Sequence, residues 1–332
     1  MALQAPVEPA PTNVQVAWAS STHDQVVVTW DETGDLRNRV EAVRADGSSA
    51  GFYQLYSQAG QPNRLVVDKE QIRVDIDRDL RVAVTAVDAS GNPLSEAGLS
   101  PVFDTGVPPA PVITAVEPRA DGTIKATWTP GQAGEDTTPN DPLDVPAEVP
   151  PRFVPVTIGP GDPYEEGPAS TATSFVFEGP ANTVTRVGAH TVNEWTTNAV
   201  LGWTATASYG DVAATRIAAT IPKTAPKGGK LTVTGTVTLL RLFCDMGLRC
   251  WEDVSADSGR LVRLESRTGA GAAWQTVATT TTDANGKFTV SVTFPGTRDY
   301  RVVAPIVVGT SEKLAKAPFA TPPVTTKARA AS

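Results

Sequence analysis

The sequence predicts an all-β protein made of three tandem β-sandwich domains. From Leu80 to Ala86 apolar side chains occupy every second position, the period of two that is typical of a strand with one buried face. Pro (28 residues) and Gly (27 residues) are frequent while aromatic residues make up only 6%, as expected of many short strands joined by turns. No long stretch places apolar residues with a helical period, so almost no helix is expected.

The first sandwich is predicted to follow an extended arm rich in Pro and Ala at residues 1–11. Its strands are runs of β-branched and aromatic residues that end at turn residues. These runs are 14–18, 25–30, 39–44, 52–56, 64–67, 72–76, 80–87 and 100–103. The turn Asp88-Ala-Ser-Gly-Asn-Pro93 closes the seventh run, because Gly and Asn tolerate positive φ and Pro ends the strand.

A second copy of this pattern follows a proline-rich connection at residues 106–111. The run that ends at Trp128 matches the run that ends at Trp30, an offset of 98 positions that also places Val14 on Val112. One sandwich domain has about 100 residues, so the sequence indicates an internal duplication. Residues 130–151, rich in Pro, Asp and Glu, interrupt this copy, and a loop of this length is either functional or disordered.

A third unit is predicted after a second Pro/Gly-rich linker at residues 221–229. Its strands are expected at 230–238, 260–265, 274–277 and 287–292, with a hairpin turn at Asp283-Ala-Asn-Gly286. Residues from Ser311 on are expected to form a loose, slightly basic tail.

These motifs carry two resemblances. The run from Leu80 to Asn92 resembles the penultimate strand and following turn of a fibronectin type III domain, which usually has a corner tyrosine where this chain has Leu80. The resemblance implies a corner held by packing alone, and it implies that Trp30 and Trp128 are core residues. Val233-Thr-Gly-Thr-Val237, Trp274-Gln-Thr-Val-Ala278 and Thr281-Thr-Asp-Ala-Asn-Gly-Lys-Phe288 resemble bacterial Ig-like modules of secreted and surface proteins.

The predicted organisation is therefore an arm, three domains and a tail. The predicted boundaries are 1–11 for the arm, 12–106 for a fibronectin type III-like domain, 107–222 for a second one with the long loop 130–151, 223–310 for a bacterial Ig-like domain and 311–332 for a flexible tail.

Charge is divided unevenly along the chain. Residues 1–222 hold 13 Lys+Arg against 28 Asp+Glu, a formal charge of −15, whereas residues 223–332 hold 15 against 8, a charge of +7. The net charge of −8 argues against general nucleic-acid binding. The split favours head-to-tail assembly or a basic docking end, although two unrelated surfaces would give the same numbers.

The termini and hydropathy favour a protein that works outside the cell without membrane insertion. No apolar run approaches the roughly 20 residues of a membrane span. The start, Met1-Ala-Leu-Gln-Ala-Pro, has neither the basic nor the apolar region of a signal peptide. Either a signal was removed and Met1 added, or the protein is made in the cytoplasm and reaches the exterior by another route.

Few residues carry reactive chemistry, so the sequence predicts no catalytic, cofactor-binding or metal-binding residues. The only histidines, His23 and His190, fall in different predicted domains, which disfavours a Ser-His-Asp or Cys-His set. Asp75, Asp77 and Asp79 have the start of a calcium-loop spacing but lack its later Gly and Glu, so a solvated strand face is the preferred interpretation.

Cys244 and Cys250 are the only cysteines, too few for a zinc set. A disulfide between them is favoured and would stabilise the fold by about 2 kcal/mol, because the closed loop is short. It would imply an oxidising environment; two buried thiols are the alternative.

Irregularly placed apolar residues are the candidates for a partner interface. Trp195 and Trp251 do not fit the repeated strand pattern, and exposed aromatic side chains stack on sugar rings or fill a partner's pocket, although core packing is the favoured interpretation for each. Leu248 and Phe319 complete the candidate set.

The combination of domains resembles minor tail or capsid-decorating proteins of bacteriophages. This resemblance implies a non-enzymatic structural or adhesive virion protein, whose partners are other virion proteins or further copies of itself, with a host cell-surface polysaccharide as a further candidate. The alternative is a secreted bacterial cell-surface protein whose modules act as spacers or polysaccharide-binding accessories.

Overall fold

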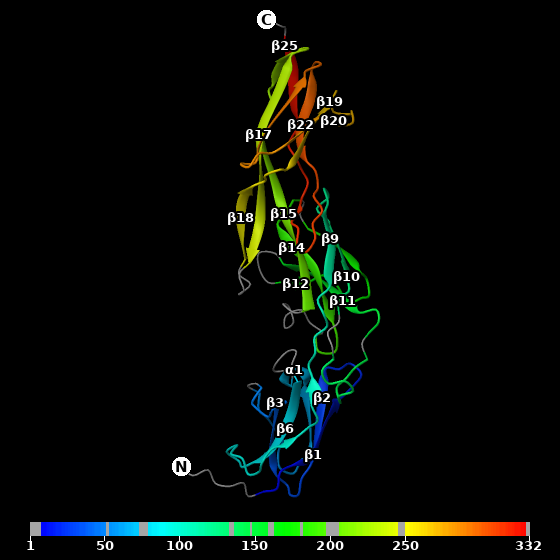
Figure 1. The fold of residues 1–332 in the computed structure, drawn as a ribbon, viewed down its shortest axis with the longest axis vertical. Helices are drawn as coiled ribbons and strands as arrows, with labels where there is room; N and C mark the ends of the chain where they lie inside the picture. Colours follow the sequence, from blue (N-terminus) through cyan, green and yellow to red (C-terminus); the bar gives the residue numbers. More distant parts are fainter. Residues whose placement is uncertain are drawn as a thin grey trace. The chain divides into compact units, whose positions relative to one another are not determined.

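The structure is a computed structural model that describes residues 8–50, 53–72, 79–132, 136–146, 148–158, 163–179, 182–196, 206–244 and 250–329 (Figure 1). Within these ranges the chain is built from strands, and one short helix, α1 (Lys69–Ile72), interrupts them. The strands pair into mostly antiparallel sheets, with β15 (Ala207–Thr220) and β23 (Ala315–Lys316), and β16 (Thr224–Pro226) and β25 (Val324–Arg329), as parallel pairs. The sheets bury apolar side chains between them, so the predicted all-β sandwich class is confirmed.

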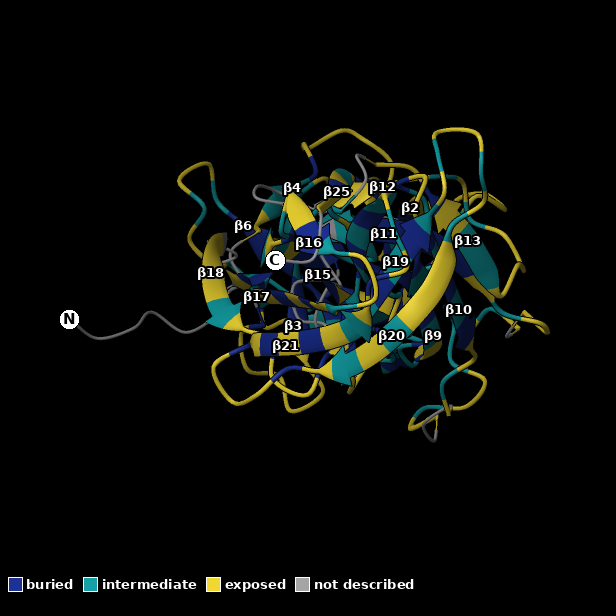
Figure 2. Cartoon of the chain, turned by 90° about the horizontal axis from the view of Figure 1, so that it is seen from above, coloured by how far each residue is buried: buried dark blue, intermediate teal, exposed yellow. Residues whose placement is uncertain are grey.

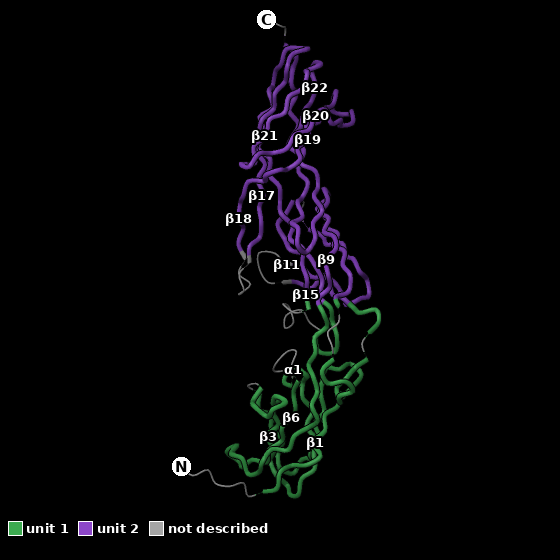
Figure 3. The backbone as a smooth tube through the Cα atoms, viewed as in Figure 1, with its two compact units in different colours: residues 1–109, 132–152, 191–206 green, residues 110–131, 153–190, 207–332 purple. Residues whose placement is uncertain are grey.

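The chain divides into two compact units that are not continuous in sequence (Figure 3). Unit 1 contains residues 1–109, 132–152 and 191–206, and unit 2 contains residues 110–131, 153–190 and 207–332. Two segments of the predicted second domain therefore fold with the first sandwich.

Unit 1 is a sandwich of two sheets. Its strands are β1 (Thr12–Trp18), β2 (Gln25–Asp31), β3 (Arg37–Arg44), β4 (Leu55–Tyr56), β5 (Arg64–Asp68), β6 (Asp79–Val87), β7 (Gly98–Leu99) and β8 (Phe103–Asp104). One sheet has the order β1-β2-β5 and the other the order β4-β3-β6-β7, with β8 also paired to β6.

The alternation in the sequence explains how these sheets face each other. In β2 the side chains of Val26, Val28 and Trp30 are buried while their neighbours point outward. Leu80, at the start of β6, is fully buried in the same core, where it packs against apolar neighbours. The fibronectin-like corner is thus occupied by an apolar contact.

Unit 2 contains a second and a third sandwich with separate cores. Its strands are β9 (Val112–Pro118), β10 (Ile124–Thr129), β11 (Arg152–Ile158), β12 (Pro163–Glu165), β13 (Ser174–Phe177), β14 (Thr185–Val192), β15 (Ala207–Thr220), β16 (Thr224–Pro226), β17 (Lys230–Cys244), β18 (Cys250–Ala256), β19 (Leu261–Arg267), β20 (Gln275–Thr281), β21 (Lys287–Thr293), β22 (Arg298–Ala304), β23 (Ala315–Lys316), β24 (Phe319–Ala320) and β25 (Val324–Arg329).

The long strands β15 and β17 connect the second and third sandwiches. β15 pairs with β14 through residues 207–212 and then with β17 through residues 214–220. β17 pairs with β21 near its start and with β18 near its end. One sheet, in the order β12-β11-β14-β15-β17-β18, therefore runs from one sandwich into the other (Figure 1).

The expectation of a free linker at residues 221–229 is consequently wrong. Ile221 and Ala225 are buried in the core of the third sandwich, at 8% and 3% exposure, and β16 pairs with β25. The segment returns the chain from β15 into the same sheet, and apolar burial fixes its path.

The flexible tail predicted for residues 311–332 is also wrong for its described part. β23 pairs with β15, β24 with β22, and β25 with β16 and β22. Ala315, Ala317 and Thr326 are buried, so this basic stretch completes both sandwiches of unit 2. In the predicted N-terminal arm, residues 1–7 lie outside the described residues, and the Glu8 amide donates a hydrogen bond to the Leu94 carbonyl.

Candidate functional site

The two histidines lie in different units. His23 has a positive φ of 55° and packs edge-on against Trp18, with ring centroids 5.1 Å apart. His190, in β14, is 1% exposed, and its Nε2 lies 3.7 Å from a Glu165 carboxylate oxygen. A Ser-His-Asp or Cys-His set needs a histidine in a cleft, whereas His190 is enclosed by protein and His23 contacts an aromatic ring.

Trp195 is a core residue of unit 1, which makes it unsuitable for a partner interface. It is 2% exposed and stacks on Phe103, with ring centroids 6.3 Å apart and an angle of 14° between the rings. Trp18 contacts it at 4.8 Å and donates its indole N–H to the Leu143 carbonyl at 2.8 Å. Leu143, from the long acidic loop, is 1% exposed, so the described part of that loop is anchored to the first sandwich.

Three carboxylates come together beside this anchor. Oxygen atoms of Asp104, Asp141 and Asp144 lie within 4.8 Å of one another. Asp141 accepts hydrogen bonds from the Leu143 amide at 2.6 Å and the Asp104 amide at 2.8 Å, and the Thr138 hydroxyl bonds Asp104 at 2.8 Å. These bonds hold the loop in place, so the cluster has a structural use that the sequence spacing did not predict.

Glu194 lies next to this cluster, and its carboxyl pKa is strongly raised. Burial raises its pKa from 4.5 to about 7, and the charges of Asp104 and Asp144 act in the same direction. Lys69 acts in the opposite direction; its side chain is 4% exposed, and its ammonium donates to the Glu194 carbonyl oxygen at 2.6 Å. Burial also raises the pKa of Asp141.

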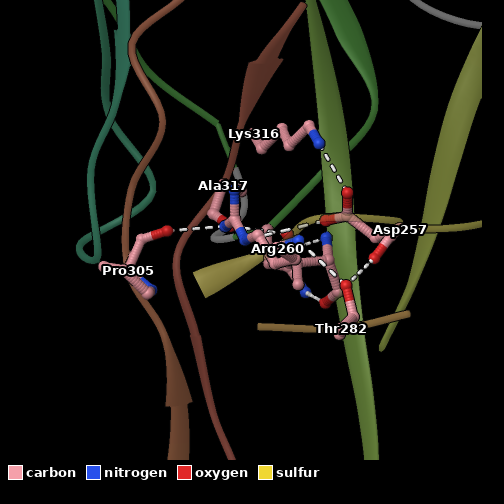
Figure 4. A network of polar contacts seen from close by, with 8 residues as sticks. Asp257, Arg260, Thr282, Pro305, Lys316 and Ala317 are labelled. Carbon is pink, nitrogen blue, oxygen red and sulfur yellow. Dashed lines mark hydrogen bonds and ion pairs between the residues drawn. The ribbon is translucent and has the colours of Figure 1, made fainter. Parts of the chain in front are cut away.

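A buried ionic network in unit 2 locks the C-terminal segment to the third sandwich (Figure 4). Asp257 and Arg260 are 1% and 2% exposed. Asp257 accepts from the Lys316 ammonium at 2.5 Å, and Arg260 donates to the carbonyl oxygens of Pro305 and Ala317 at 2.5 and 3.3 Å. The Asp257 carboxylate and the Arg260 guanidinium both contact protein atoms, so the network has a structural role.

The two cysteines occupy facing positions at the end of the β17–β18 ribbon. Cys244 and Cys250 are direct partners in the antiparallel register. Their side chains lie outside the described residues, as does Leu248, and the disulfide stays a prediction. Phe319 is half-buried on β24, where it pairs with Ala304 of β22.

Exposed aromatic side chains gather on the same ribbon. Phe243 of β17 and Trp251 of β18 are register partners, 43% and 54% exposed, with centroids 6.3 Å apart and rings 20° from parallel. Figure 2 shows β18 as a largely exposed strand. Of the four apolar residues proposed as an interface, Trp251 is the one with a described and strongly exposed side chain.

A polar cavity adjoins this aromatic pair. It has a volume of about 210 Å³, and its walls come from β14, β15, the end of β17 and the turn at residues 310–314. Arg186 and Asp211 form an ion pair in the wall, with Nε 2.6 Å from the carboxylate. Arg241, Phe243 and Lys313 also line it. None of these polar residues was predicted from the sequence, because they are far apart in the chain.

No protein-family model matches the sequence, and neither does any curated protein. Among solved structures, a tetra-tandem repeat from the extending region of a large adhesion protein is 14% identical and covers 97% of this chain and 75% of that one, at a TM-score of 0.24. The chicken CNTN1 FN1–FN3 domains are 10% identical, with coverages of 96% and 99% and a TM-score of 0.23. A Ca²⁺-stabilized adhesin that helps an Antarctic bacterium reach out and bind ice is 17% identical, with coverages of 98% and 76% and a TM-score of 0.27. These TM-scores are low, so the conclusions on function rest on the side chains and strands described above.

Proposed function

We propose that this protein is a non-enzymatic structural or adhesive protein that works outside the cell. The observation that carries the proposal is the pair of strands shared by the two sandwiches of unit 2. β15 has 14 residues and β17 has 15, so each extends over about 50 Å. Hydrogen bonds between β15 and β17 join the second sandwich to the third without a flexible linker. Such a rigid connection suits a spacer whose domains must keep their relative orientation under mechanical force.

The placement of the titratable groups supports a role without catalysis. His190 is buried, and His23 rests on Trp18. Asp257 and Arg260 are occupied by structural contacts. Within the described residues, no helix has both the length and the apolar character needed to cross a bilayer.

The finer proposal is a bacteriophage virion protein, either a minor tail protein or a capsid-decorating protein. The charges of −15 and +7 on the two parts of the chain favour assembly with a neighbour or a second copy. A secreted bacterial cell-surface protein that uses the same sandwiches as spacers is the second candidate, and the exposed aromatic pair on β17 and β18 favours it because such a surface suits polysaccharide binding.

Antibodies raised against the purified chain test the proposal. They should label intact virions, or intact cells of the source organism, from the outside in immunogold microscopy. Labelling of virions supports the first candidate and labelling of cells the second. Labelling seen only after cells have been permeabilised would contradict an extracellular role of either kind.

A further inference from the structure

We infer that the cavity beside the β17–β18 ribbon binds an acidic saccharide, with a carboxylate-bearing sugar held by Arg241 and a sugar ring held against Phe243 and Trp251. The inference deepens the adhesive function proposed above by naming the chemical class of the ligand. Two observations support it: the Arg241 guanidinium has a buried N–H without a hydrogen-bond acceptor in the described part of the chain, and the rings of Phe243 and Trp251 are exposed to solvent.

Arg241 is the first of these groups. Its Nε is buried, and within the described part of the chain it has no hydrogen-bond acceptor. The other arginine of the wall, Arg186, is already paired with Asp211. Asp253 is the register partner of Arg241, yet no ion pair joins the two within the described residues. Since a buried N–H without an acceptor is costly, the site favours a ligand that brings an acceptor, and a planar carboxylate matches the guanidinium fork.

The aromatic pair is the second group. Arg241 and Phe243 are two residues apart on β17, so their side chains leave the strand on the same face. Phe243 lines the cavity, and Trp251 extends the aromatic surface from β18. Large exposed rings at the rim of a polar cavity are suited to the apolar C–H face of a sugar ring, because stacking there removes apolar surface from water.

The remaining wall supports a sugar over a simple anion. Arg186, Arg241 and Lys313 face the carboxylates of Asp211 and Glu312 in the lining, a formal charge of +1, so the wall favours one carboxylate per sugar ring over the dense charge of a polyphosphate. The same carboxylates, together with hydroxyls of Thr310 and Ser311, are acceptors and donors for sugar hydroxyls. A volume of about 210 Å³ corresponds to roughly seven waters at liquid density, enough for one substituted sugar ring.

Calorimetric titration of the full chain with two tetrasaccharides tests the inference. The probes are the α-1,4-linked tetramer of galacturonic acid and the neutral α-1,4-linked tetramer of glucose. The acidic tetramer is expected to bind, and the neutral tetramer to bind at least about tenfold more weakly, since it leaves Arg241 without an acceptor. Citrate, which has carboxylates but no sugar ring, is expected not to compete.

Variants assign the binding to this site. Arg241→Met keeps the apolar stem and should weaken binding of the acidic tetramer by about tenfold or more. Trp251→Thr should weaken binding of both tetramers. Val254→Thr, on the opposite face of β18 and 60% exposed, and Tyr164→Thr, an exposed ring of β12, are matched controls that should leave binding unchanged. Thermal melts of each variant verify that unit 2 is folded.

Three results would overturn the inference: no heat from the acidic tetramer at about 10 mM, equal affinity for the neutral tetramer, or full displacement by citrate. Unchanged binding in a folded Arg241→Met variant would do so as well. The two proposals fail separately, because antibody labelling of intact particles or cells does not depend on saccharide binding.

Discussion

Replacing Glu194 by Gln should stabilise the protein, and the gain should depend on pH. Burial together with the charges of Asp104 and Asp144 raises the pKa of Glu194 from 4.5 to about 7. The folded state therefore holds this proton more tightly than the unfolded state. Below pH 4.5 the carboxyl is protonated in both states and Glu194 imposes no penalty. Between pH 4.5 and 7 the unfolded state ionises first, so stability falls as the pH rises.

The size of the effect follows from the shift. A change from 4.5 to about 7 corresponds to about 3 kcal/mol of differential free energy. Because solvent reaches part of the side chain, screening reduces the expected penalty to about 2 kcal/mol. Glutamine has the shape of the protonated carboxyl and cannot ionise. The variant should thus match the parent chain at pH 4 and exceed it by about 2 kcal/mol at pH 8.

Urea unfolding followed by tryptophan fluorescence at several pH values between 4 and 8 measures this difference, since Trp18 and Trp195 report on the same core. Glu96→Gln, an exposed position of unit 1, is the matched control and should give equal shifts at every pH. If the curves for Glu194→Gln and the parent chain run parallel from pH 4 to 8, the raised pKa and its assignment to burial are refuted.

Three further predictions concern unit 2. Asp257→Asn leaves Arg260 without its buried counter-charge and should lower the free energy of unfolding by about 3 kcal/mol in urea titrations. No measurable change would mean that solvent already stabilises the charge of Arg260. Gly235→Ala would place a methyl group 2.6 Å from a Phe288 ring atom and over the Ala218 carbonyl, and should lower the melting temperature clearly, whereas Gly271→Ala, with open space around it, should not. Mass spectrometry of the unreduced chain should find Cys244 and Cys250 two hydrogens lighter than two thiols, and ready alkylation without reductant would reject the disulfide.

The strands of the sandwiches could be predicted from the sequence because one buried face leaves a period of two. Val26, Val28 and Trp30 illustrate this, since each lies on the inner face that the alternation indicates. The match between Trp30 and Trp128 likewise reflects equivalent core positions, at 3% and 2% exposure. Local pattern and burial agree at these positions, so sequence alone was sufficient.

The sites could not be predicted in this way, because they depend on contacts between distant segments. Leu143 and Trp195 are buried in the core of the first sandwich, although each follows Trp18 by 125 residues or more in the sequence. No local sequence pattern predicts that they belong to this core. The cavity beside Phe243 joins residues near positions 186, 241 and 312. The signal available in the sequence was limited to Trp251, an aromatic residue outside the repeated strand pattern.

The junction between the second and third sandwiches shows why proline and glycine were misleading there. The proline and glycine residues within 221–229 indicated a linker between domains. Local composition, however, does not distinguish a turn that leaves a sheet from a turn that returns to it. The distinguishing residues are Ile221 and Ala225, two apolar residues of this stretch that are buried. Gly235 adds to the evidence, because only a residue without a side chain allows β17 to approach Ala218 of β15 and Phe288 of β21 so closely. A buried apolar residue inside a Pro/Gly-rich stretch, followed by a glycine within a strand, therefore favours a shared sheet over a free linker.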